Sequence, residues 1–240
     1  MKNYDTMKTQ PFVLPYDYYH RWIRAAFQMA EKHYKLFVIL GFLVTMSQVV
    51  ISVVPYVGSL AAAVLRFIFA LSSLRLMHAL FQNQTQTIES FFEMSFDQKV
   101  IMKFKNHILA CLALGLFMDL GMHLNLPHFY ILTTLLSFAL FLVPMTAYMQ
   151  LRHPHLSDKE AAQFVLSQTW ANVGSLIPLT FLLLFLGLAS IVLFVVPFFI
   201  FFLPLTFPLI YLVYMGLCEY KTLEELVQNW NSSVTSPAAQ

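Results

Sequence analysis

The sequence predicts an all-α integral membrane protein with six transmembrane helices, arranged as three hairpins with short outer turns, and with amphipathic helices on the cytoplasmic side. Composition, the spacing of apolar runs and the distribution of basic residues predict this class. Of the 240 residues, 59% are hydrophobic and 11% are charged, whereas soluble domains are about 45–50% apolar and about 25% charged. A net charge of +2 also argues against nucleic acid as a partner, because nucleic-acid-binding domains are typically strongly basic.

Six apolar runs are long enough, or nearly so, to cross a membrane. A helix needs about 18 or more predominantly apolar residues to cross about 30 Å of hydrocarbon. The runs cover residues 36–54, 59–81, 108–124, 129–150, 175–196 and 198–218. The first run follows a long polar or amphipathic segment without a small-residue cleavage site behind it, so we expect it to stay in the mature protein rather than act as a signal peptide.

The basic residues indicate which ends of the predicted spans face the cytoplasm. The short connections near Pro55, Pro127 and Pro197 carry no charged residue, whereas the longer segments hold most of the 14 Lys and Arg residues. The basic residues in these longer segments are Lys2, Lys8, Arg21, Arg24, Lys32, Lys35, Lys99, Lys103, Lys105, Arg152, Lys159 and Lys221. Since basic residues gather on the cytoplasmic side, we expect both termini in the cytoplasm and three tight turns outside.

The chain divides by composition into four parts. These are a polar tail at 1–16, an interfacial amphipathic helix at 17–35, a six-span membrane domain at 36–220 and a C-terminal cytoplasmic segment at 221–240. In the second part, Trp22, Ala26 and Phe27 belong to an apolar stripe with helical spacing, while Arg21 and Arg24 occupy other faces. This pattern predicts a helix that lies on the membrane surface.

We expect four aromatic side chains to act as interfacial anchors, because tryptophan gathers at membrane interfaces. They are Trp22, Phe27, Trp170 and Trp230. Simple anchoring is favoured over the alternative, a partner-docking or lipid-sensing surface.

Each predicted hairpin precedes a short polar segment with a helix-start signal. Ser157 and Glu160 have the spacing of a capping box. The turn prolines recur at similar intervals, which fits either a structural repeat or even loop lengths in any six-span protein.

Ionisable residues within predicted spans are candidates for function. Arg66 and Asp119 lie at similar depths, about 12 Å and about 8 Å from the outer ends of their spans at 1.5 Å per residue. An ion pair between them would lower the free energy of burying either charge. In the alternative, Arg66 extends to the outer interface by itself and Asp119 contacts lipid headgroups.

Two further polar groups are candidate binding sites. Arg75 shares a helix face with Ser72 and His78, which could hold an anionic lipid headgroup, although a plain anchor at the cytoplasmic interface is favoured. A cation site could form from three residues near the outer side, which are Asp119, His123 and His128. Their uncertain convergence argues against a metal, so we expect neither metal nor cofactor.

The sequence lacks the motifs of common enzyme classes. It contains no His-Glu-x-x-His, Gly-x-Ser-x-Gly or Gly-x-x-x-x-Gly-Lys pattern and no pair of aspartates within a span. Cys111 and Cys218 both fall near expected cytoplasmic helix ends, where a reducing environment argues against a disulfide. We therefore expect no enzymatic activity and no catalytic residues.

Four short motifs resemble the YciC-type and related six-span families of bacterial membrane proteins. The motifs are RWIRAAF at 21–27, VPYVG at 54–58, SQTWAN at 167–172 and PLIYLVY at 208–214. The resemblance covers about residues 20–220 and implies a bacterial inner-membrane protein. It also implies a fold shared with the membrane portion of some glycerophosphodiester phosphodiesterases, with no catalytic residues to transfer.

These observations predict a non-enzymatic inner-membrane protein that acts as an envelope scaffold, assembly or accessory factor. The expected partners are membrane lipids together with another protein or a second copy of the chain. The alternative is a small-solute or lipid transporter, for which the prolines Pro204 and Pro208 would expose backbone carbonyls to a cavity. In a packed bundle the same prolines set helix direction only.

Overall fold

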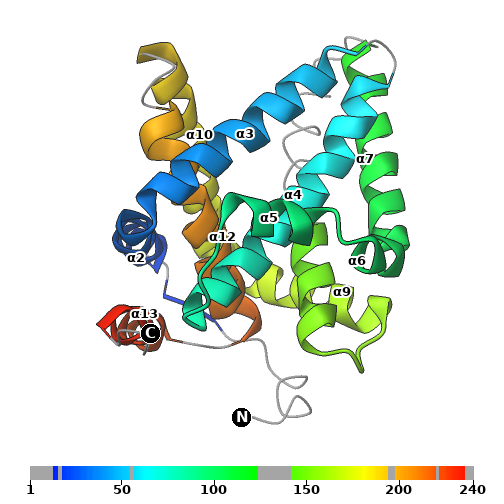
Figure 1. Ribbon diagram of the computed structural model, residues 1–240. Helices are drawn as coiled ribbons and strands as arrows, with labels where there is room; N and C mark the ends of the chain where they lie inside the picture. Colours follow the sequence, from blue (N-terminus) through cyan, green and yellow to red (C-terminus); the bar gives the residue numbers. More distant parts are fainter. Residues whose placement is uncertain are drawn as a thin grey trace. The chain divides into compact units, whose positions relative to one another are not determined.

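The computed structural model describes residues 13–15, 18–54, 57–123, 142–193, 198–219 and 222–235 (Figure 1). For some helical residues in these ranges, notably 118–123 and 231–235, only the backbone is described. Every secondary-structure element in the described ranges is helical, so the predicted all-α class is confirmed. The elements with both bounds described are α2 (Tyr18–Lys32), α3 (Tyr34–Ser52), α4 (Gly58–Phe81), α5 (Ile88–Ser95), α6 (Gln98–Lys103), α7 (Lys105–His123), α9 (Asp158–Ala171), α10 (Val173–Leu193), η1 (Phe198–Phe202), α12 (Leu203–Cys218) and α13 (Leu223–Thr235). Residues 142–152 are helical as well.

Three helices within the described residues are long and apolar enough to cross a membrane. They are Tyr34–Ser52, Leu60–Phe81 and Phe199–Cys218, which coincide with three of the six predicted runs. Ile88–Lys103 and Lys105–Phe117 would form a fourth membrane-length segment if they count as one span, although the chain bends by 100° between them. The predicted run 129–150 lies mostly outside the described residues. Six spans and their orientation therefore stay predictions.

The chain forms two compact units, each built from segments distant in sequence. The first unit contains Met1–Phe42, Leu76–Thr87 and Gln163–Gln240, and the second contains Leu43–Arg75 and Ile88–Ala162. Because α3, α4 and α9 each contribute residues to both units, neither the predicted spans nor the predicted hairpins correspond to the units.

In the first unit, α12 is the helix on which others pack. Helix α2 packs against α12, and it also contacts α10 and α13. The rings of Phe37 and Phe207 stack with centroids 5.4 Å apart. Gly41 lets the backbone of α3 approach α12, since a Cβ at this position would lie 2.8 Å from Cβ of Leu203.

The second unit contains an aromatic cluster between α4 and α5. Phe69 of α4 is buried and lies against Phe91, Phe92 and Phe96, with ring centroids 6.1–6.4 Å apart. These contacts hold α5 against the middle of α4. Asp97 is the N-cap of helix α6, and its carboxylate accepts hydrogen bonds from backbone N–H groups of the first turn.

The predicted capping box is present at the beginning of α9. The backbone N–H of Ser157 donates to Oε2 of Glu160 at 3.1 Å, and the N–H of Glu160 donates to Oγ of Ser157 at 3.3 Å. Asp158 next to it accepts hydrogen bonds from the side-chain amides of Gln150 and Asn106. These hydrogen bonds hold the pKa of Asp158 below its usual value.

Candidate membrane-interface site

Helix α2 has one face that is covered by protein, and its aromatic residue Phe27 lies exposed outside that face. The covered face consists of Tyr18, Trp22, Ala25, Ala26, Met29 and Ala30. Trp22 is fully buried, whereas Phe27 is 49% exposed. The predicted stripe placed these two side chains together, yet five residues on a helix turn the direction by about 140°. The stripe therefore comprises two faces, of which only that of Trp22 packs on protein.

Trp22 fixes α2 against α12. A Cβ placed on Gly216 of α12 would lie 3.3 Å from the indole ring, so the glycine provides the space in which this ring lies. Tyr18 packs edge-on against Trp22 with ring centroids 5.3 Å apart. The tight fit shows that Trp22 is a packing residue within the first unit.

Helix α13 is bound to both ends of α2. At one end, the N–H of Leu223 donates to the hydroxyl of Tyr18 at 3.1 Å. At the other, Nζ of Lys32 donates to the carbonyl of Trp230 at 3.3 Å and lies 5.9 Å from the centroid of its ring. Trp230 is 1% exposed and packs against Phe81 and His33, with centroids 4.8 Å and 5.4 Å away. The first and last described helices thus form one layer.

Burial shifts the pKa values of the polar groups in this layer. It raises the pKa of Tyr18 and lowers the pKa of Lys32. The pKa of His33 is lowered by burial and further by the charge of Lys32. Each shift disfavours the charged form, as desolvation does.

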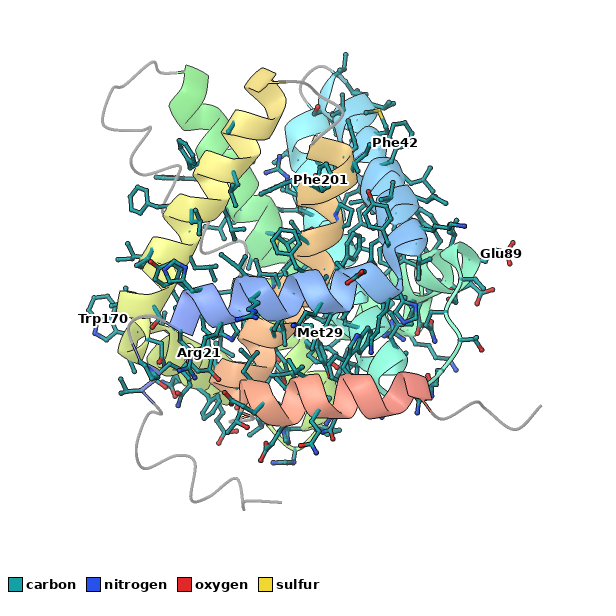
Figure 2. All side chains as sticks on the ribbon, turned by 90° about the vertical axis from the view of Figure 1, so that its left-hand side faces the viewer. Arg21, Met29, Phe42, Glu89, Trp170 and Phe201 are labelled. Carbon is teal, nitrogen blue, oxygen red and sulfur yellow. The ribbon has the colours of Figure 1, made fainter. Side chains whose placement is uncertain are left out.

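An open groove of about 480 Å³ lies between α2 and α13. Its lining consists of Arg21, Arg24, Ala25, Gln28, Leu223, Glu224, Val227 and Gln228. Figure 2 shows α2 and α13 side by side, with Arg21 near the beginning of α2. One guanidinium nitrogen of Arg21 lies 3.5 Å from Oε1 of Glu224, and their side chains are 54% and 70% exposed. The groove therefore combines two arginines, one carboxylate and two amides on an apolar floor.

Residues 13–15, before α2, are hydrogen-bonded to the junction between α9 and α10. The N–H of Leu14 donates to Oδ1 of Asn172 at 2.7 Å. The hydroxyl of Ser175 donates to the carbonyl of Pro15 at 2.9 Å. The predicted polar tail 1–16 therefore includes a structured part, residues 13–15, because side chains of a distant segment satisfy its backbone groups.

The structure places two of the four predicted anchors inside protein. Trp22 and Trp230 are buried, whereas Phe27 and Trp170 are exposed. Trp170, near the end of α9, is 77% exposed (Figure 2). Only Phe27 and Trp170 therefore have the exposure that contact with lipid requires.

The predicted Arg66–Asp119 pair is not tested by the described residues. Arg66 is exposed on α4, but the side chain of Asp119 lies outside the description. The same holds for the cation site, since the side chain of His123 and the whole of His128 lie outside it. Elsewhere in the described part, no group of three or more His, Cys, Asp or Glu side chains could hold a metal ion.

The polar group predicted around Arg75 is engaged by protein. Arg75 donates to the carbonyl of Met94 at 2.8 Å and lies 3.5 Å from the carboxylate of Asp97. Nδ1 of His78 lies 3.1 Å from the hydroxyl of Tyr211, and Ser72 is buried. Arg75 and His78 thus bind different protein groups, which argues against an open headgroup site at this face.

Sequence reasoning missed the groove and the layer of α2 and α13. The signal available in the sequence was charge complementarity, because Arg21 and Arg24 begin one amphipathic segment and Glu224 and Glu225 begin another. Charge alone did not specify which of several polar segments would pair.

No family model, curated protein or solved structure matches the chain. The geometry of the described residues is therefore the basis for the proposed function.

Proposed function

We propose that the chain is a six-span, non-enzymatic protein of the bacterial inner membrane that acts as a scaffold, assembly or accessory factor. In this proposal, α2 and α13 form a docking layer on the cytoplasmic side. The observation that supports it best is the attachment of α13 to α2 through Tyr18, Lys32 and Trp230, with charged faces turned outward. A layer held rigidly and exposed at its surface suits binding to a partner.

The same attachment supports the proposed topology. Helix α2 precedes all predicted spans and α13 follows them, yet the two helices are in contact. In this proposal they lie on the same side of the membrane, and an even number of crossings between them is consistent with their contact. Six is such a number, and the distribution of basic residues favours the cytoplasm as that side.

Cysteine labelling tests the topology. In a variant whose Cys111 and Cys218 are replaced by alanine, single cysteines at Val57, Asn125 and Phe198 should react with a membrane-impermeant thiol reagent added to intact cells. Cysteines at Gln84, Ser157 and Ser236 should react only after the cells are opened. Labelling of the Ser157 position from outside would contradict six spans with both termini in the cytoplasm.

Purification of charge variants tests the docking layer. Glu225 is exposed on α13 and lies outside the groove lining, so Glu225→Lys should release a partner that copurifies from native membranes in mild detergent. Lys159→Glu is the matched control, since it reverses an exposed charge on α9 in the second unit. Retention of every partner by Glu225→Lys at wild-type levels would refute a docking role for this face.

A small-solute or lipid transporter is the second candidate, and Arg66 favours it. This exposed cation lies within Leu60–Phe81, a helix of membrane length, and charges at membrane depth often mark substrate pathways. Uptake of a small solute or lipid into vesicles that contain the wild-type protein would support transport if Arg66→Gln abolishes it and Lys159→Gln does not. Such a result would replace the scaffold proposal.

A further inference from the structure

We propose that the groove between α2 and α13 is a binding site for a phosphate-bearing anion. The inference rests on the described packing of the two helices. It goes beyond the proposed scaffold role, which requires no small ligand. Its volume of about 480 Å³ lies within the range of roughly 300–1,000 Å³ found for small-molecule sites.

The donors in the groove suit a phosphate. Arg21 and Arg24 lie one turn apart on α2 and both line the groove. Guanidinium groups bind phosphate oxygens through paired N–H donors and stay charged at all physiological pH values. Gln28 and Gln228 add amide donors from both helices, which are groups that bind oxygen without adding charge. A bound phosphate would thus receive hydrogen bonds from α2 and α13 together.

Glu224 acts as an internal competitor for the anion. Its carboxylate lies 3.5 Å from Arg21, and both side chains are more than half exposed. Ion pairs with such exposure stabilise a protein by only about 0–1 kcal/mol, so a phosphate with more negative charge can take the place of the carboxylate. The pair directs Arg21 toward α13.

The groove also lies where lipid phosphates are expected. Phe27 is half exposed and follows Arg24 by three residues, which places the two side chains about 60° apart around α2. An exposed aromatic residue beside arginines is typical of helices that lie at a lipid–water interface. Both an anionic lipid headgroup and a soluble phosphate share the required chemistry, and the experiment below separates them.

The lipid arm of the test uses full-length protein in detergent, with native mass spectrometry to count retained lipids. Wild-type protein should retain phosphatidylglycerol in preference to phosphatidylcholine. The double variant Arg21→Gln/Arg24→Gln should bind phosphatidylglycerol at least about fivefold more weakly, because one basic residue near a membrane surface contributes about that factor. Lys159→Gln removes an exposed positive charge elsewhere and should match the wild type.

The soluble arm uses inorganic phosphate, with binding followed by the line width of its phosphorus-31 resonance. Broadening that requires Arg21 and Arg24 would identify a soluble phosphate as a ligand, whereas retention of phosphatidylglycerol alone would identify a lipid headgroup. Either result supports the site. If phosphatidylglycerol retention and the broadening of the phosphate resonance are each the same in the wild type and the double variant, the proposal is overturned.

A third variant predicts a change in the opposite direction. Glu224→Gln removes the competing carboxylate and should strengthen anion binding about twofold to fivefold, because it removes one negative charge beside Arg21. Thermal unfolding in detergent checks that each variant is folded. Loss of anion binding in folded Glu224→Gln would contradict the competitor role. The cysteine-labelling pattern does not depend on anion binding, so failure of this site would leave the proposed topology untouched.

Discussion

Helices α3 and α12 have similarly apolar sequences but very different surroundings. Within an 18-residue stretch, 17% of the residues are buried in Tyr34–Ser52, which is α3, and 67% in Phe199–Cys218, which consists of α12 and most of η1. The exposed side of α3 carries aliphatic residues such as Val49 and Val50. Most of α12 is covered, including the hydroxyl-bearing Tyr211 and Tyr214.

This difference shows that apolar composition specifies a membrane environment but not a place within the protein. Lipid and protein interior accept the same side chains, so an apolar run fits either one. The features that mark α12 as central are residues that would be costly in lipid or that leave space for a neighbour. Tyr211 reaches His78 with its hydroxyl, and Gly216 accommodates the ring of Trp22.

The largest effect is expected from removing the side chain that fixes α2 on α12. Trp22→Ala should lower the free energy of unfolding by about 3–5 kcal/mol, because it leaves a cavity where a fully buried indole was packed. Trp170→Ala, at an exposed tryptophan, is the control and should change it by less than about 0.5 kcal/mol. Thermal or denaturant unfolding in detergent measures both, and equal losses would refute the contrast between covered and exposed faces.

A second pair of truncations compares α12 and α3 directly. Leu212 is fully buried on α12, so Leu212→Ala should destabilise the protein by about 2–5 kcal/mol. Val50 is 67% exposed on α3, and Val50→Ala should cost well under 1 kcal/mol because no protein cavity is created. Unfolding under the same detergent conditions provides the measurement. A larger loss for Val50→Ala would mean that α3 packs on another surface.

The covered side of α3 should be sensitive to added volume. Gly41→Ala would bring a Cβ to 2.8 Å from Cβ of Leu203, a rigid part of the side chain that cannot rotate away. We expect a loss of about 1–3 kcal/mol from this overpacking, measured by thermal unfolding. Val50→Leu adds volume on the exposed side and should be tolerated. An unchanged Gly41→Ala variant would show that α3 and α12 are not in tight contact.

The smallest effect concerns pH at His33, which joins α2 to α3. Because burial lowers its pKa in the folded protein, the unfolded chain binds a proton first as the pH falls below about 6.5. The contribution of His33 to the free energy of unfolding should therefore be constant above about pH 6.5 and should decrease as the pH falls through the folded-state pKa. His33→Gln should reduce the fall in melting temperature between pH 7.5 and pH 5, with His20→Gln, at an exposed histidine of α2, as the control. If the melting temperature of His33→Gln falls as much as that of the wild type, His33 does not contribute to the pH dependence of stability.

The sequence predicted the class and several local features of this protein. The helical class, three membrane-length helices and the Ser157–Glu160 capping box are confirmed. Each depends on composition or on residues near one another in the chain. The remaining spans, the orientation and the Arg66–Asp119 pair stay predictions.

Contacts between distant segments were beyond sequence reasoning. The helical period showed that α2 is amphipathic, but the choice between Trp22 and Phe27 as its covered residue depends on the glycine at position 216 of another helix. The groove likewise needs both α2 and α13. A single sequence shows which residues of a helix form an apolar face, but it does not show which other helix packs on that face.

The most direct test of the claim that α3 crosses the membrane is to measure whether lipid or water surrounds its exposed face. With Cys111 and Cys218 replaced by alanine, a nitroxide spin label at Val50 in reconstituted bilayers should collide often with oxygen and rarely with a water-soluble nickel chelate. A label at the exposed Ser157 should show the reverse preference. This result would place α3 in lipid. If the label at Val50 is as accessible to the nickel chelate as the label at Ser157, the exposed face of α3 lies in water and α3 does not cross the membrane.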